Sequence, residues 1–245
     1  MLRTRDLAKR FGAHAAVDGV DLEIREGTLH AIIGPNGAGK TTLFNLLSGE
    51  LRPSAGTIAF AGRDVTRLDA TSRSQLGIGR SFQRTNVFPK LTVFENARLA
   101  AQSRTKHSAE FWRTAAALAA VNARTEAVLA EFGLLEHRAR LASELAGGDQ
   151  RLLELAITLA TDPVLLLLDE PSQGLSPEDA RHLIDRIGTL AARYTIVLIE
   201  HNMPLVMRLA GEITVMNFGR VLAHGTPDAI RADPAVRAAY LGKRA

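Results

Sequence analysis

The sequence contains no cysteine, which excludes disulfide bonds and thiolate metal sites. No apolar run approaches the roughly 20 residues that a membrane-spanning helix needs. A typical run, Val164 to Leu168, is far shorter and is followed by two acids. The first residues, Met1 to Asp6, hold no apolar signal core. From these absences we expect a protein that is not exported and that works in the reduced cytoplasm.

A dense block of one charge is also missing. The 30 basic residues exceed the 26 acidic ones by only 4. The basic residues are scattered along the chain and are not interleaved with aromatic residues, which make up 5% of the sequence. This pattern is typical of an ordinary solvated surface, and we expect no nucleic acid partner.

The distribution of apolar residues predicts an α/β protein. A length of 245 residues and a hydrophobic content of 46% suit one large domain, or a domain with a subdomain. Val20–Ile24 alternates as a half-exposed strand does, and Thr57–Phe60 is another short strand. Val164–Leu168 and Thr195–Ile199 are nearly continuous apolar runs, as in central parallel strands.

The middle of the chain differs from both ends. From about residue 97 to residue 146 it is rich in alanine, leucine, arginine and glutamate and lacks proline, and Ala115 to Ala120 contains only alanine and leucine. This composition favours helices. The sequence therefore predicts a parallel α/β core interrupted by a helical insert.

One segment carries a specific chemical signal, the pattern G-x-x-x-x-G-K-[ST] of a phosphate-binding loop. It lies between an apolar run that predicts a buried strand, Leu29–Ile33, and a segment that predicts the start of a helix. The glycines let backbone N–H groups converge on an anion, and the helix adds the positive end of its dipole. We expect the lysine to reach the β- and γ-phosphates and the threonine hydroxyl to bind Mg²⁺. The candidate nucleotide-binding residues are Gly34, Pro35, Asn36, Gly37, Ala38, Gly39, Lys40, Thr41 and Thr42.

A second signal follows a buried strand, where Asp169 and Glu170 succeed four leucines. In open α/β sheets, ligands bind at the carboxyl ends of the strands. Asp169 is therefore the candidate carboxylate for Mg²⁺, together with Thr41. Glu170 is the candidate general base that positions the attacking water, and its presence favours hydrolysis over passive binding.

Further landmarks complete an ordered set. Gln83 ends the stretch Gly79–Gln83, the glycine pair lies in Leu145–Arg151, and His201 follows the next apolar strand. Together with the phosphate loop and the acidic strand end, this order resembles the ATP-binding-cassette ATPases over essentially the whole chain. The resemblance implies a P-loop ATPase core with a mainly parallel sheet, an N-terminal antiparallel β subdomain and a helical subdomain insert. Residues 1–83 and 162–245 would form the core with the β subdomain, and residues 84–161 the helical subdomain, within a single domain of 1–245.

Four longer stretches narrow the resemblance to the ATPase subunits of importers for branched-chain and related hydrophobic amino acids or amides. The long insert around Trp112 agrees with this group. The ATPase of lipopolysaccharide export shares several of these features and is the alternative within the family. The stretches are Gly34–Asn45, Arg80–Arg84 with Phe88 and Leu91–Asn96, Glu200–Met207 and Ala238–Gly242.

The resemblance assigns further roles. Phe11 would stack on adenine, although a lone phenylalanine is more often a core residue. Gln83 would contact Mg²⁺ and the attacking water, and His201 would contact the γ-phosphate. Gly147 and Gly148 would approach the γ-phosphate of an ATP held by a second ATPase chain, identical or different, so that each ATP lies between two chains.

The implied cofactors are ATP and Mg²⁺. The implied partners are a second ATPase chain, transmembrane permease subunits that dock on the helical subdomain and, indirectly, a periplasmic or extracellular binding protein. The implied location is the inner face of the cell membrane, on its cytoplasmic side.

Three positions depart from the common pattern of the family. Ala146 and Asp149 stand where serine and glutamine are usual, and Ser176 stands where many members have aspartate. Loss of the serine hydroxyl removes one hydrogen bond to the γ-phosphate, worth about 0.5–1.5 kcal/mol. These changes keep open a second hypothesis, that the chain is a weakly hydrolysing partner in a heterodimer. A third, a soluble family member acting on nucleic acid or ribosomes, is disfavoured by the single cassette.

Overall fold

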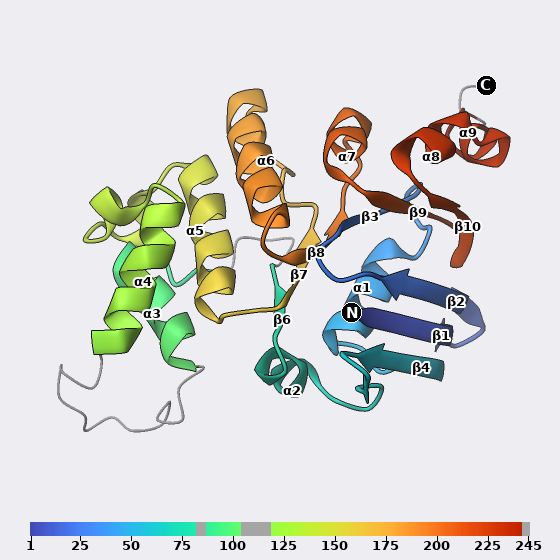
Figure 1. The fold of residues 1–245 in the computed structure, drawn as a ribbon, viewed down its shortest axis with the longest axis horizontal. Coiled ribbons are helices and arrows are strands. Elements are labelled where there is room, and N and C mark those ends of the chain that lie inside the picture. Colours follow the sequence, from blue (N-terminus) through green and yellow to red (C-terminus); the bar gives the residue numbers. More distant parts are fainter. Residues whose placement is uncertain (82–86, 104–118, 242–245) are drawn as a thin grey trace.

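Two sheets organise the protein in the computed structural model, which describes residues 1–81, 87–103 and 119–241 (Figure 1). The larger sheet has the strand order β10-β9-β3-β8-β7-β6, and the smaller has the order β2-β1-β4-β5. The strands are β1 (Leu2–Phe11), β2 (His14–Ile24), β3 (Leu29–Ile33), β4 (Ala55–Phe60), β5 (Arg63–Asp64), β6 (Ile78–Arg80), β7 (Leu165–Asp169), β8 (Thr195–Ile199), β9 (Glu212–Asn217) and β10 (Arg220–Gly225).

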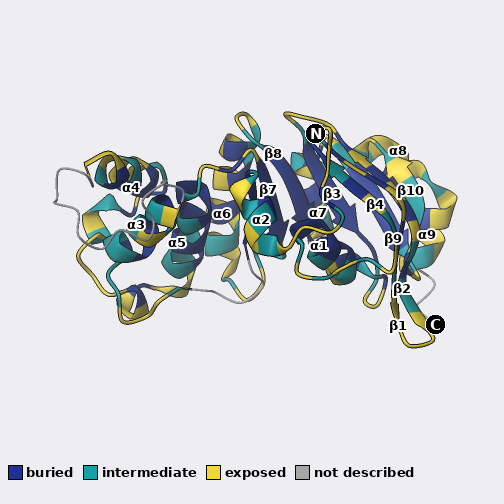
Figure 2. Ribbon diagram, turned by 90° about the horizontal axis from the view of Figure 1, so that it is seen from below, coloured by how far each residue is buried: buried dark blue, intermediate teal, exposed yellow. Residues whose placement is uncertain are grey.

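The larger sheet is parallel from β9 to β6, and only β10 at its edge runs antiparallel. All residues of β3, β7 and β8 are buried (Figure 2). In β7, Leu165 and Leu167 join the apolar cluster on one face, and Leu166 and Leu168 join the cluster on the other. This double burial is the reason that these strands read as continuous apolar runs in the sequence.

The smaller sheet is antiparallel throughout and covers the same face of the parallel sheet as helix α1 (Lys40–Ser48). Between Val20 and Ile24, β2 alternates buried and exposed residues, as its sequence predicts. The predicted antiparallel β subdomain, mainly parallel core sheet and helical insert are therefore confirmed.

Helices cover the opposite face of the parallel sheet. Helices α3, α4 and α5 pack together on the left of Figure 1, α6 lies beside α5, and α7 lies on the other side of α6. Residues of α6 and α7 share an apolar cluster with residues of β7 and β8. Of the other α-helices, α2 lies near β6, and the pair α8–α9 lies next to β9 and β10. Their bounds are α2 (Ala70–Gln75), α3 (Val93–Ser103), α4 (Ala119–Glu131), α5 (Gly147–Ala160), α6 (Pro177–Ala191), α7 (Met203–Leu209), α8 (Pro227–Ala232) and α9 (Pro234–Leu241).

The helical insert is less continuous than its composition predicts. Gly133, with φ +72°, follows the end of α4, and only short 3₁₀ turns at 135–137 and 142–144 precede α5. A left-handed residue ends a helix even where the neighbouring residues are good helix formers. Residues 115–118 of the predicted alanine-rich helix, and Trp112, lie outside the described residues. The boundary between residues 83 and 84 also falls there, so the subdomain limits stay a prediction.

Across the three described ranges, no helix is both long enough and apolar enough to cross a membrane.

Candidate active site

The phosphate loop joins β3 to α1, the context that the sequence predicts. Two of its glycines are required by close backbone packing. A Cβ on Gly34 would lie 2.3 Å from the carbonyl oxygen of Met216, and one on Gly39 would lie 2.3 Å from that of Ala16. Gly39 is also the N-cap of α1, with φ +96° and no side chain to cap the helix. The first N–H groups of α1 are therefore available to an anion.

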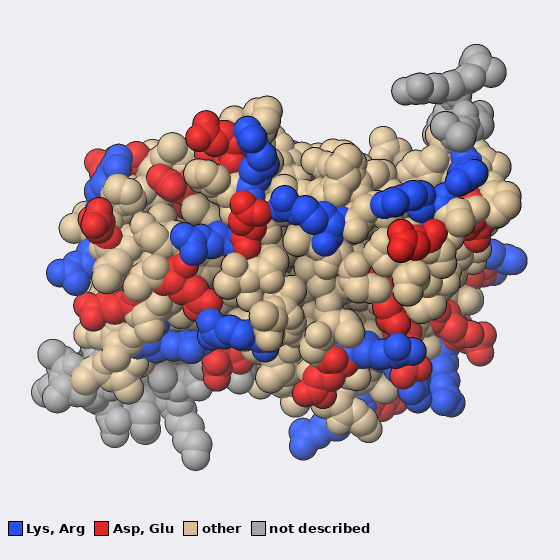
Figure 3. Space-filling view, turned by 45° about the horizontal axis from the view of Figure 1, so that its top comes forward, with Lys and Arg blue, Asp and Glu red and all other residues tan. Residues whose placement is uncertain are grey.

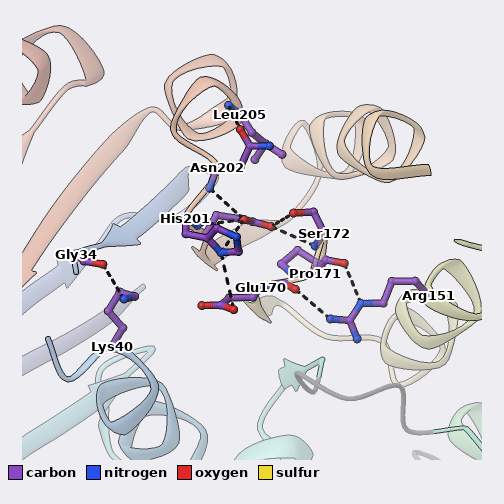
Figure 4. Close-up of polar contacts among 10 residues, drawn as sticks. Gly34, Lys40, Arg151, Glu170, Pro171, Ser172, His201, Asn202 and Leu205 are labelled. Carbon is purple, nitrogen blue, oxygen red and sulfur yellow. Dashed lines mark hydrogen bonds and ion pairs between the residues drawn. The ribbon is translucent and has the colours of Figure 1, made fainter. Parts of the chain in front are cut away.

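Lys40, the first residue of α1, is buried with 8% of its surface exposed. Its Nζ donates hydrogen bonds to the carbonyl oxygens of Gly34 at 2.7 Å and Pro35 at 3.1 Å (Figure 4). Burial lowers the pKa of Lys40, and the charges of Glu170 and Asp169 act against this shift. The ammonium is thus held at the loop by groups that a phosphate can replace.

A cavity of about 460 Å³ lies over this loop and is called the loop cavity here. The loop lines it together with two residues of β2 and two that follow β7, so three distant segments of sequence meet there. The lining residues are His14, Ala16, Asn36, Gly37, Ala38, Gly39, Lys40, Thr41, Thr42, Glu170 and Gln173. A larger cavity of about 760 Å³ lies between the smaller sheet and β9–β10, but its lining includes no residue of the phosphate loop.

Asp169, the last residue of β7, is 2% exposed. The pKa of Asp169 is raised, mainly because the carboxyl is buried. The charge of Glu170 adds to this shift, and the cation of Arg80 acts against it. Its Oδ2 lies 3.8 Å from Nη2 of Arg80, and none of the described residues donates a hydrogen bond to this oxygen. A buried carboxylate oxygen without a donor fits a cation ligand, and one carboxylate with phosphate oxygens and water is a usual set for Mg²⁺.

Thr41 is exposed and lines the loop cavity, where its hydroxyl could complete that set. Among the described residues, no group of three or more histidine or acidic side chains is placed to hold a metal ion.

Glu170 has a left-handed backbone, with φ +46°, which is strained for a residue with a side chain. Its amide donates to the carbonyl oxygen of Ile199 at 2.9 Å. The guanidinium of Arg151, on α5, donates to the carbonyl oxygens of Glu170 at 3.2 Å and Pro171 at 2.9 Å. These contacts hold the turn in which the side chain of Glu170 faces the loop cavity (Figure 4).

His201 follows β8, as predicted, and its side chain is 62% exposed. Its Nδ1 lies 3.8 Å from Oε2 of Glu170, so the two candidate catalytic side chains are neighbours (Figure 4). The third candidate, Gln83, lies outside the described residues.

The glycine pair begins α5, with Ala146 as the N-cap. A Cβ on Gly148 would lie 2.7 Å from side-chain atoms of Asp179, whereas one on Gly147 would meet no heavy atom of the described chain within 4 Å. The described lining of the loop cavity includes no residue of 145–149. Within one chain the glycine pair and the phosphate loop are therefore not brought together.

The structure accounts for two departures from the family pattern. The hydroxyl of Ser176 caps α6, accepting from the amide of Asp179 at 3.1 Å, a role that aspartate also fills. Asp149 lies in the first turn of α5, where the helix dipole favours an acid. Ala146 has no side-chain group for capping, and nothing in the described contacts replaces the missing hydroxyl.

Phe11 ends β1 with half of its surface exposed, so it is not a core residue. The Nζ of Lys9 lies 5.3 Å from the centre of its ring. An exposed aromatic face is available for stacking on a base, and stacking on adenine stays a prediction.

Arg80 is a site residue that the sequence reasoning quoted but gave no role. Its guanidinium donates to Ser48 Oγ at 2.6 Å and to Asn45 Oδ1 at 2.7 Å, both on α1, while facing Asp169 on β7. Arg80 therefore ties the phosphate-loop helix to the acidic strand end. Its position three residues before Gln83 was the only signal in the sequence.

Comparison with known proteins adds independent information. The profile of the ABC transporter family matches residues 17–173, and that of the branched-chain amino acid ATP-binding cassette transporter matches residues 220–245. The high-affinity branched-chain amino acid transport ATP-binding protein LivG of Salmonella typhimurium is 43% identical, covering 99% of this chain and 98% of the relative. BraF of Pseudomonas aeruginosa, with the same description, is 40% identical with the same coverage.

Among solved structures, the ADP conformation of an ATP-binding cassette from an ABC transporter superposes with a TM-score of 0.87. It is 29% identical and covers 99% of both chains.

Proposed function

The chain belongs to the ABC transporter family, as an ATPase with the C-terminal segment of the branched-chain amino acid cassettes, and from this membership we propose that it powers a membrane importer for branched-chain or related hydrophobic amino acids. The C-terminal match favours this reading over lipopolysaccharide export. The observation that carries the ATP-dependent part of this proposal is the loop cavity, where Lys40, the N-terminus of α1 and Glu170 face one volume.

Binding of ATP begins at the loop. The N–H groups of the loop and of α1 take the phosphates, and Lys40 exchanges the carbonyl oxygens of Gly34 and Pro35 for phosphate oxygens. Thr41 and Asp169 would hold Mg²⁺, with Gln83 as a third candidate, and the bound ion would neutralise charge on the phosphates. Phe11 would stack on the adenine, next to the start of β2.

Hydrolysis is assigned to Glu170, which orients water and accepts its proton. Its carboxylate lies near His201, which is exposed enough to reach the γ-phosphate. The strained turn at Glu170 keeps the carboxylate pointed into the loop cavity before the substrate arrives, so little reorganisation is needed when water attacks.

The catalytic unit is proposed to be a pair of ATPase chains, identical or different. ABC transporter ATPases form dimers and work with permease components. The separation of the glycine pair from the phosphate loop within one chain supports such a composite site, because Gly147 and Gly148 can then reach the ATP of the partner. Closure on ATP and opening after hydrolysis would drive the permease subunits.

The helical subdomain is the proposed docking surface for these membrane subunits, at the cytoplasmic face of the membrane. The binding protein outside the membrane would be reached only through them. Nucleic acid is not a proposed partner, because basic and acidic side chains are interspersed on the face shown in Figure 3.

The test is ATP hydrolysis by the purified chain with Glu170→Gln. A glutamine keeps the shape but cannot accept a proton, so the rate should fall by roughly 10²- to 10⁴-fold. The variant should accumulate as an ATP-bound dimer in size-exclusion chromatography. Glu26→Gln, an exposed residue in the turn before β3, is the matched control. Full hydrolysis by Glu170→Gln would refute the assigned base.

A further inference from the structure

The chain leaves the parallel sheet at two neighbouring points, after β7 and after β8. Asp169 pairs with Ile199 in the register of these strands, and the amide of Glu170 donates to the carbonyl oxygen of Ile199. The segment 170–172 and the segment 200–202 therefore begin side by side. They carry Glu170 and His201, whose relative position decides how water and the γ-phosphate are held.

The carboxylate of Glu200 bridges these two segments. Its Oε1 accepts hydrogen bonds from the Ser172 hydroxyl at 2.6 Å and the Ser172 amide at 3.1 Å. Its Oε2 accepts from the amides of His201 at 3.1 Å and Asn202 at 3.5 Å. The Glu200 residue is only 1% exposed, and Figure 4 shows Ser172, His201 and Asn202 gathered around this point.

The bond pattern requires a carboxylate. Burying this charge is unfavourable unless donors surround it, and here both oxygens face donors. A glutamine would keep one acceptor oxygen but turn its amide group toward donors on one side. The position therefore favours a side chain with two acceptor oxygens, although the hydrolysis chemistry assigned to Glu170 makes no use of it.

The turns fixed by Glu200 are those that aim the candidate catalytic groups. Glu170 has its strained φ of +46° two residues before Ser172, and strain of this kind persists only where surrounding contacts impose it. Arg151 holds the carbonyl oxygens of Glu170 and Pro171, and Glu200 holds the next residue of the same turn. On the other side, Glu200 holds the amide of His201 itself.

We propose that Glu200 is a positioning residue for ATP hydrolysis, which fixes the separation of the Glu170 carboxylate and the His201 imidazole by bonding both segments that carry them. The inference rests on the proposed function. Glu200 makes no contact with the described loop-cavity lining that would bind phosphate, so its role concerns the rate of hydrolysis and not the affinity for ATP.

The test compares Glu200→Gln with wild type in steady-state ATP hydrolysis and in equilibrium ATP binding. We expect kcat to fall by about tenfold or more, since small displacements of reacting groups are costly. KM and the Kd for ATP should stay within about twofold, because the phosphate loop is intact. Glu212→Gln is the matched control. This carboxylate on β9 is 17% exposed and pairs with Arg25 at 3.0 Å, away from the site, so kcat should not change.

Ser172→Ala supplies a second measurement, which applies even if Glu200→Gln does not fold. It removes the hydroxyl that donates at 2.6 Å and should lower kcat several-fold with KM unchanged. In the double variant the two losses should not multiply, because both act on one bridge.

A folded Glu200→Gln with a kcat within about twofold of wild type would overturn the proposal. So would wild-type hydrolysis by Ser172→Ala, or a loss of ATP affinity as large as the loss of kcat. A wild-type chain that binds ATP but does not hydrolyse it would instead overturn the proposed function.

Discussion

Substitution of Gly147 by alanine should affect the stability of a single chain and the assembly of two chains in opposite ways. Gly147 is the first residue of α5, its φ is not in the left-handed region, and an added Cβ would meet no heavy atom of the described chain within 4 Å. Alanine at such a position removes freedom from the unfolded chain and should stabilise the protein by about 0.4–1 kcal/mol. The neighbouring Gly148 cannot serve, because its Cβ would press on Asp179.

The same methyl group should damage the composite site. If the N–H groups of this turn approach the γ-phosphate of the partner's ATP, a Cβ at Gly147 would hold them away. Loss of one hydrogen bond to a charged group costs about 1.5–3 kcal/mol, which corresponds to a roughly 10- to 150-fold lower rate of hydrolysis. Thermal unfolding and steady-state ATPase rates would show the two effects moving in opposite directions.

A matched control is available in Gly211→Ala. Gly211 is also outside the left-handed region, and an added Cβ there would lie 3.8 Å from the carbonyl oxygen of Leu29, an ordinary contact. It should leave hydrolysis unchanged. In the background of Glu170→Gln, Gly147→Ala should abolish the ATP-bound dimer seen by size-exclusion chromatography. Unchanged hydrolysis and dimerisation by a folded Gly147→Ala would refute the assignment of α5 to the partner's nucleotide.

Three further predictions follow from the described contacts. The buried His30 donates or accepts a hydrogen bond with Thr214 at 2.8 Å, and burial together with His224 lowers its pKa to about 3. Below about pH 6.5 this histidine is protonated in the unfolded chain but not in the folded chain. The free energy of unfolding is therefore highest above that pH and falls by about 1.4 kcal/mol per pH unit below it. Between pH 7 and pH 5, the free energy of unfolding measured with urea should fall by about 2 kcal/mol more for wild type than for His30→Gln. Equal decreases in the two proteins would contradict this prediction. Arg73 is fully buried, and its guanidinium donates to five main-chain carbonyl oxygens, two of them in the last turn of α1. Arg73→Lys should lower the free energy of unfolding by about 3 kcal/mol or more, because an ammonium cannot reproduce the planar fork, while Arg67→Lys on the exposed surface should cost almost nothing. Ala146→Ser should cap α5 and raise the free energy of unfolding by about 1 kcal/mol; an unchanged ATPase rate would remove the reason for regarding the chain as a weakly hydrolysing subunit.

Local patterns predicted the core elements well because each depends on a few adjacent residues. The phosphate loop needs its glycines, lysine and threonine in fixed order. The period or continuity of the apolar residues predicts β2, β3, β7 and β8. The helical insert was predicted in kind but not in detail. Its breaks depend on the backbone at Gly133 and on helix ends that composition does not encode.

The contacts around the site could not be predicted in the same way. Arg80 bonds residues 32 and 35 positions away, and Glu200 bonds Ser172 at a separation of 28 positions. Nothing in the residues next to Arg80 or Glu200 distinguishes a buried bridge from a surface charge. These contacts depend on the strand order of the larger sheet, which places β7 next to β8 and to β6.

The sequence by itself determined which chemical groups are present, in what order, and which strands and helices carry them, because hydrogen-bonding loops and apolar periodicity are short-range properties of a chain. Only the tertiary structure decided that Lys40 and Glu170 face one cavity, and that, among the described residues, Asp169 keeps an oxygen without a donor and Gly147 has no heavy atom within 4 Å of an added Cβ. Those facts arise from the packing of strands and helices that are far apart along the chain, where burial and close approach depend on neighbours that no local pattern specifies.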